Sequence, residues 1–101
     1  MSAQNKTIEL VATLVAKPGQ EQALQDLIIN LVPQVKAEEG CIEYVAHTTS
    51  EQPGTFFIYE IWASQAALDA HAIGPVLKPL RDRTEELLTG SPNLQMLIRI
   101  A

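Results

Sequence analysis

A carboxylate and a histidine are the side chains best placed to do chemistry in an otherwise apolar part of the sequence. In residues 55–63 the alternation of a predicted strand places four side chains on one side: Phe56, Ile58, Glu60 and Trp62. His71 follows Ala67 by one turn of a predicted helix, so we expect it to face the sheet. Histidine can accept a proton near neutral pH, since its unperturbed pKa is about 6.5. The pattern predicts an apolar small-molecule site that carries a base.

Plainer interpretations of the same residues stay open at this point. Aromatic residues favour strands and fill cores, and a buried histidine is often satisfied by one backbone carbonyl. Glu60 is a second possible base or orienting group if burial raises its pKa, or it pairs with Arg99 near solvent. His47 stands at a predicted strand end, and Cys41 has no neighbouring base, which favours a small core residue over a nucleophile.

Composition excludes several functional classes. The 101 residues include 7 Lys and Arg against 12 Asp and Glu, a net charge of -5, which disfavours nucleic acid and anionic membrane surfaces as partners. A single cysteine and the lack of zinc-ligand spacing predict a reducing compartment, and we expect the cytoplasm. No apolar run reaches the roughly 20 residues of a membrane span, and no apolar targeting segment opens the chain.

Cofactor motifs are likewise missing from the sequence. It contains neither a glycine-rich phosphate loop nor a GxSxG or HExxH motif, so we expect no nucleotide cofactor, serine hydrolysis or zinc chemistry. A haem would require His71 or His47 as its axial ligand. We therefore predict a protein without a bound cofactor or metal.

Six elements are predicted to position these residues. Residues 7–16 alternate as a strand, and residues 24–35 repeat apolar side chains at helical spacing, with Pro33 predicting a kink or a broken last turn before Gly40. Turn residues 50–54 join two strands, which carry all five aromatic side chains: Tyr44, Phe56, Phe57, Tyr59 and Trp62. Ser64 caps a helix that ends near Ile73, Pro79 opens another, and residues 94–100 alternate as a last strand.

The resulting order, βαββαβ, predicts an α+β fold of the ferredoxin-like type in one domain over residues 1–101, with a core from about residue 7. Its helices cover one face of the sheet. Val11 and Val15 share a face of the first strand, and both faces of residues 55–63 are apolar, so the other sheet face needs a cover. A second copy of the chain is the predicted cover, in a homodimer.

Several short motifs resemble those of a known family. They are Lys17-Pro18-Gly19, Glu39-Gly40-Cys41 with Tyr44, Tyr59-Glu60-x-Trp62, and Ala67-Leu68-x-x-His71. Over about residues 8–80 the chain resembles the antibiotic biosynthesis monooxygenase (ABM) family, in its small quinol-monooxygenase-like branch. The resemblance implies a dimeric α/β barrel that oxidises phenolic or quinol substrates with dioxygen and no cofactor. Tyr44, Trp62 and His71 fall on the family's motif positions.

Two positions depart from patterns found among similar proteins. Many relatives carry a second histidine after the proline that follows the short helix, where this chain has Val76 after Pro75. The polyketide-oxidising members carry an asparagine four residues before the tryptophan, where this chain has Ile58. We therefore expect the group that holds the developing oxyanion to be missing or supplied by another residue.

The leading hypothesis is a cofactor-independent monooxygenase of a small phenol or hydroquinone, in which His71 removes the phenolic proton. Trp62 and the Phe56 side of the strand would hold the ring, and Glu60 or Tyr44 would orient its oxygen. One alternative is an isomerase of a small phosphorylated hydroxyketone, with Lys78 and Arg81 binding the phosphate. Another is a dimeric ligand-binding or stress-related module without enzymatic activity.

Overall fold

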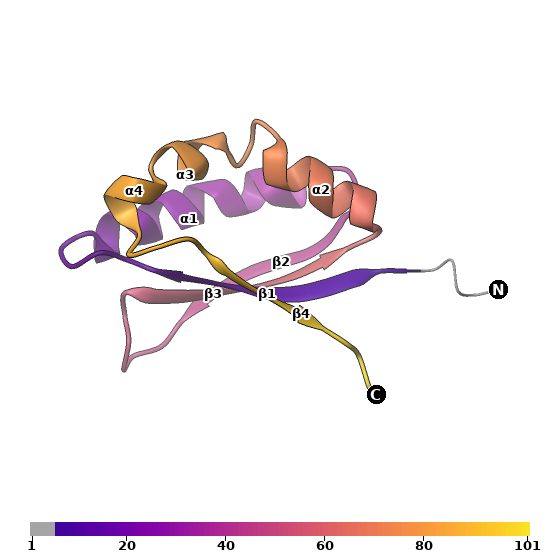
Figure 1. Ribbon diagram of the computed structural model, residues 1–101, viewed down its shortest axis with the longest axis horizontal. Helices are drawn as coiled ribbons and strands as arrows, with labels where there is room; N and C mark the ends of the chain where they lie inside the picture. Colours follow the sequence, from indigo (N-terminus) through magenta and orange to yellow (C-terminus); the bar gives the residue numbers. More distant parts are fainter. Residues whose placement is uncertain (1–5) are drawn as a thin grey trace.

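The computed structural model describes residues 6–101, which form a four-stranded sheet with all of its helices on one face (Figure 1). The elements are, in chain order, β1 (Ile8–Val15), α1 (Glu21–Lys36), β2 (Cys41–Thr48), β3 (Thr55–Trp62), α2 (Gln65–Ile73), α3 (Lys78–Asp82), α4 (Thr84–Leu87) and β4 (Asn93–Leu97). The strand order is β2-β3-β1-β4, and every neighbouring pair is antiparallel. This confirms the predicted ferredoxin-like architecture.

Helix α1 buries the apolar stripe that the sequence places at helical spacing, including Leu24, Ile28, Leu31 and Val35. The prediction of a broken last turn is wrong, because α1 continues past Pro33 to Lys36. Pro33 leaves the carbonyl of Ile29 without its helical donor, and both residues are exposed, so water can take the donor's place. Among residues 6–101, no helix is both long and apolar enough to cross a membrane.

Strand β3 separates its two faces as alternation predicts. Phe56, Ile58, Glu60 and Trp62 are all buried beneath the helices, whereas the residues between them are half-buried on the open face. The antiparallel pairing sets Tyr44 of β2 opposite Glu60, so the Tyr44 side chain also points into the helix side of the sheet. The aromatic side chains of β2 and β3 on this face therefore lie beneath α1 and α2.

The C-terminal region differs from the predicted helix and strand. The helix expected from Pro79 is divided at Arg83 into α3 and α4, although Leu80, Leu87 and Leu88 are buried as predicted. The backbone of Arg83 leaves the α conformation, with φ -111 and ψ 13. Strand β4 ends at Leu97 and all of its residues are exposed; Ile98 and Ile100 lie beyond it, almost fully in solvent.

Gly40 controls how closely α2 approaches the turn between α1 and β2. Its φ is +83, a left-handed conformation that other residues rarely adopt. A Cβ placed on it would lie 2.5 Å from the Cβ of Ala67 on α2. Gly19 has a similar φ of +89, but nothing lies within 4 Å of the position its Cβ would take. Both glycines have a backbone conformation that other residues rarely adopt. Only at Gly40 would a side chain also collide with a neighbouring helix.

Gly40→Ala is therefore expected to destabilise the protein more than Gly19→Ala. The left-handed backbone alone costs about 1–2 kcal/mol for alanine, and forcing α2 away from Gly40 adds about 1–3 kcal/mol. Urea unfolding of both variants at one protein concentration measures the difference. Equal losses of unfolding free energy would show that the close contact with Ala67 contributes nothing.

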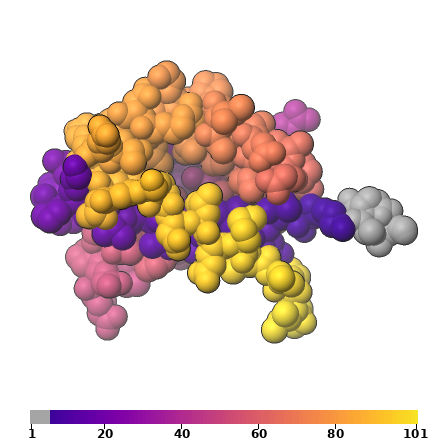
Figure 2. All heavy atoms as spheres, viewed as in Figure 1, coloured from indigo at the N-terminus to yellow at the C-terminus, as the bar shows by residue number. Residues whose placement is uncertain are grey.

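The sheet face opposite the helices is open and carries both apolar and polar side chains. Val11 pairs with Tyr59 across the two central strands, and Tyr59 pairs in turn with Val45 of β2. The β2–β3 hairpin and the C-terminal end both project beyond the sheet on this side (Figures 1 and 2). An apolar patch at the centre of the face thus lies between two projections, a shape that a second copy could fill.

We expect this face to pair with its own copy, so that sedimentation gives twice the mass of one chain at micromolar concentration. Val11→Glu should shift the protein to monomers, because it places a charge in the middle of the apolar patch. Val11→Thr has a similar size and shape and serves as the control. A wild-type protein that sediments as a compact monomer would contradict the prediction.

Candidate active site

A cavity of about 190 Å³ lies between the helices and the sheet. Its walls are mostly aliphatic and come from β1, β2, β3, α2, α3 and the segment around β4; the lining residues are Leu10, Ala12, Leu14, Tyr44, Ile58, Glu60, Leu68, His71, Ala72, Leu77, Leu80, Pro92 and Leu94. An apolar protein cavity of about 150 Å³ can hold benzene. The space therefore fits one substituted aromatic ring.

Three polar atoms face this cavity. Among residues 6–101, no hydrogen-bond partner is present for the Tyr44 hydroxyl, the Oε2 of Glu60 or the Nε2 of His71. No side-chain polar atom that is sealed from solvent lacks a partner in the described chain, so these three atoms keep some contact with solvent, and their residues all line the cavity. Their residues are otherwise buried, with exposed fractions of 3%, 4% and 5%. A ligand in the cavity would meet one hydroxyl, one carboxyl oxygen and one imidazole nitrogen.

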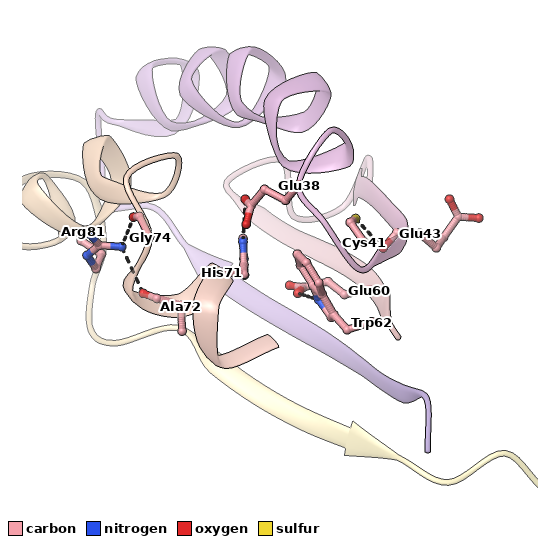
Figure 3. Close-up of polar contacts among 9 residues, drawn as sticks. All are labelled: Glu38, Cys41, Glu43, Glu60, Trp62, His71, Ala72, Gly74 and Arg81. Atoms are coloured by element: carbon pink, nitrogen blue, oxygen red, sulfur yellow. Dashed lines mark hydrogen bonds and ion pairs between the residues drawn. The ribbon is translucent and has the colours of Figure 1, made fainter. Parts of the chain in front are cut away.

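Trp62 lies beside Glu60 and His71 (Figure 3). Its side chain does not line the cavity. Its Nε1–H donates to the Oε1 of Glu60 at 2.9 Å. Its ring lies against His71 with ring centroids 4.5 Å apart and planes inclined by 31°. Trp62 is fully buried, so its observed contacts fix the orientation of the carboxyl group and the imidazole ring.

Trp62 and Phe56, which the sequence analysis expects to hold a bound ring, do not line this cavity. Side chains on one face of a strand are about 6.6 Å apart along it, so different elements cover them. Phe56, near the start of β3, lies beside Ile28 of α1 in a separate hollow. Only Ile58 and Glu60, in the middle of the strand, line the cavity. The wall that would face a ring is therefore aliphatic.

Glu38 is a site residue that sequence reasoning missed. Its Oε2 lies 3.0 Å from the Nδ1 of His71, and its side chain is 18% exposed (Figure 3). Tyr44 packs against the same imidazole in a T-shaped arrangement, with ring centroids 5.7 Å apart. A glutamate at the end of an amphipathic helix resembles an ordinary surface residue, and only its position beside the Glu39-Gly40-Cys41 motif could have drawn attention to it.

The electrostatics of the site are acidic. Burial raises the pKa of Glu60, while the Trp62 N–H and the nearby His71 partly oppose that shift. Burial also raises the pKa of Tyr44 strongly, and the carboxyl groups of Glu60 and Glu38 add to the effect, so its phenol stays protonated. Within residues 6–101, no lysine or arginine lines the cavity. A bound group that donates hydrogen bonds fits better here than an anion.

The other residues singled out in the sequence are not part of the cavity. Lys78 is paired with Asp82 at 2.7 Å, and Arg81 donates to the carbonyls of Ala72 and Gly74 at the end of α2 (Figure 3). Arg99 pairs with Glu9 at 2.7 Å and not with Glu60. His47 is exposed, with its Nδ1 beside the carbonyl of Phe57.

The donor side chains do not form a recognisable metal site. Among residues 6–101, no three side chains of the types that bind metals come together. Cys41 is partly buried, its Sγ lies 3.8 Å from the carbonyl of Glu43, and burial raises the pKa of its thiol. The proton-transfer groups in the cavity are therefore Glu60, His71 and Tyr44.

Comparison with known proteins adds a family match. The family described as antibiotic biosynthesis monooxygenase matches residues 7–83. The structure of PA3566 from Pseudomonas aeruginosa superposes with a TM-score of 0.87 at 30% identity, covering 94% of this chain and 95% of that one. The structure of Rv0793 from Mycobacterium tuberculosis gives a TM-score of 0.85 at 25% identity, over 95% of this chain and 97% of that one.

Two curated protein sequences are also similar to this chain. Rv0793, which carries the name "Putative monooxygenase Rv0793", is 28% identical over 82 residues, covering 81% of this chain and 80% of that protein. The protein sll1783 of Synechocystis is 25% identical over 81 residues, covering 80% of this chain and 55% of that protein. This chain thus spans about half the length of the Synechocystis relative.

Proposed function

Because the chain belongs to the antibiotic biosynthesis monooxygenase family, we propose that it is a monooxygenase that oxidises a small phenol or hydroquinone with dioxygen and without a bound cofactor. The observation that carries the proposal is the meeting of three unpaired polar atoms in an apolar cavity large enough for one ring. The aliphatic wall suits the ring, and the polar atoms suit its hydroxyl groups.

His71 acts as the base in this proposal. The phenolic O–H bond breaks, its proton forms a bond to Nε2, and the electron pair stays on the oxygen. The phenolate transfers an electron to dioxygen far more readily than the phenol does. General-base catalysis of this kind contributes about 10²–10⁴-fold in rate. Glu60 Oε2 and the Tyr44 hydroxyl line the same cavity and orient the second ring oxygen.

The proposed reaction consumes one dioxygen for each hydroquinone. One oxygen atom enters the ring to give a hydroxyquinone, and the other leaves as water with the two hydrogens that the substrate loses. The buried position of His71 keeps the reacting pair away from bulk water, which limits the release of reduced oxygen.

The isomerase alternative requires a phosphate-binding cation near the base. Lys78 and Arg81 are the residues predicted for that role, and both are engaged outside the cavity. The Glu38 carboxylate beside His71 would repel a phosphorylated substrate. The geometry therefore favours a neutral phenolic substrate.

Oxygen uptake with a panel of substituted hydroquinones in metal-free buffer tests the proposed function. With ¹⁸O-labelled dioxygen, we expect one labelled atom in the product, dependent on enzyme concentration. The absorption spectrum and a metal analysis of the same preparation test the absence of a cofactor. Hydrogen peroxide with unlabelled quinone would indicate simple oxidation, and no uptake at all would favour a binding module or the isomerase.

A further inference from the structure

The contact between Glu38 and His71 links the end of α1 to the buried face of α2. Glu38 Oε2 is 3.0 Å from Nδ1, and an ionised carboxylate can only accept a hydrogen bond, so Nδ1 carries the proton. The neutral ring then has its lone pair on Nε2, the nitrogen that faces the cavity. We propose that Glu38 is a positioning residue that holds His71 in the tautomer able to accept a proton from the substrate. This inference rests on the function proposed above.

The contact with Glu38 also stabilises the positive charge that the His71 ring gains when it accepts a proton. When Nε2 takes the proton, the ring becomes an imidazolium inside a site where it is 5% exposed. Burial penalises that charge, and an adjacent carboxylate stabilises it. The Trp62 ring covers one side of the imidazole. The hydrogen-bond partner of Nδ1 is Glu38. A neutral residue in place of Glu38 would remove this stabilisation.

The fold brings Glu38 and His71 together through the turn that contains Gly40. In this turn the Glu38 carbonyl accepts from the Cys41 N–H at 3.1 Å, and the Gly40 carbonyl accepts from the Ala63 N–H at 2.8 Å. The missing Cβ of Gly40 lets α2 approach at Ala67, one helical turn before His71 on the same face. Glu38 is thus held at the distance of one hydrogen bond from the base.

The ionisable groups that face His71 come from three neighbouring elements. They are Glu38 from the turn after α1, Glu60 from β3 and Tyr44 from β2. No cation from α3 or β4 lines the cavity beside it. Glu38 is the one in hydrogen-bonding contact with the ring. Removing its charge would leave the protonated ring without its nearest charged partner.

Glu38→Gln tests the proposal, with Glu39→Gln as the matched control. Glu39 is the next residue in the chain, is exposed, and has the same charge. We expect Glu38→Gln to lower kcat for hydroquinone oxidation about 10–100-fold, a part of the 10²–10⁴-fold that the base itself contributes, with KM within about twofold. Glu39→Gln should change neither quantity.

Nitrogen-15 NMR of the His71 ring gives a readout that does not depend on turnover. In the wild type we expect the Nδ1–H tautomer, and in Glu38→Gln a mixture of the two tautomers. If the amide of Glu38→Gln partly replaces the carboxylate as an acceptor, Glu38→Ala should show a larger loss of the Nδ1–H tautomer. Circular dichroism checks that each variant is folded.

The outcomes separate the two proposals. An active wild type whose Glu38→Gln variant keeps the same kcat and tautomer would overturn the role of Glu38 and leave the monooxygenase function intact. An inactive wild type would overturn the function, and the NMR spectrum of the ring would still decide whether Glu38 sets the tautomer of His71.

Discussion

Replacing His71 with alanine is expected to lower kcat for the oxidation of a hydroquinone about 10²–10⁴-fold, which is the usual contribution of a general base. The substrate's ring would still be held by the aliphatic wall, so KM should change little. The reason is the placement of Nε2, which faces the cavity while Nδ1 is bound to Glu38. Steady-state oxygen uptake measures both constants.

His47→Ala is the matched control for this prediction. It removes the other histidine of the chain, which is exposed at the end of β2 and does not line the cavity. Its oxidation rate should equal that of the wild type. Because His71 is buried, unfolding must be measured in His71→Ala, and partial rescue by added imidazole would separate lost catalysis from lost structure. A folded His71→Ala variant with full activity would make His71 structural and Glu60 the next candidate for the base.

Trp62→Ala is expected to lower the free energy of unfolding by about 3–5 kcal/mol, the usual cost of truncating a buried aromatic side chain to alanine. Trp62 is fully buried, packs against His71 and donates to Glu60. Its loss also frees both site residues to move and opens space for water, so substrate binding should weaken. Urea denaturation and substrate titration measure the two effects.

Trp62→Phe separates the ring from its N–H group. Phenylalanine keeps an aromatic ring near His71 but leaves Glu60 Oε1 without its donor, at a cost of about 1–3 kcal/mol. The pKa of Glu60 should rise further, because the Trp62 hydrogen bond lowers it in the wild type. Unfolding free energies that are the same in the wild type and Trp62→Ala would contradict the burial seen in the structure.

The elements of this fold could be predicted from the sequence because local patterns encode them. The alternation in residues 55–63 determines that Glu60 and Trp62 share a face, and the i, i+4 relation determines that His71 and Ala67 share another. Turn residues 50–54 set the hairpin, and the order of elements leaves the ferredoxin-like sheet as the simplest arrangement. Such patterns state which side of an element is buried.

The tertiary structure alone decides which buried residues meet. Glu38 and His71 are 33 positions apart, and nothing periodic relates them; their contact depends on the approach of α2 to Gly40. Likewise, Trp62 and Ile58 share one face of β3, yet only Ile58 reaches the cavity, because separate elements cover the two ends of the strand. The local periodicity of the sequence determines towards which side of its element a side chain points. Which side chains touch depends on how whole elements pack against one another, and this packing assembles the site.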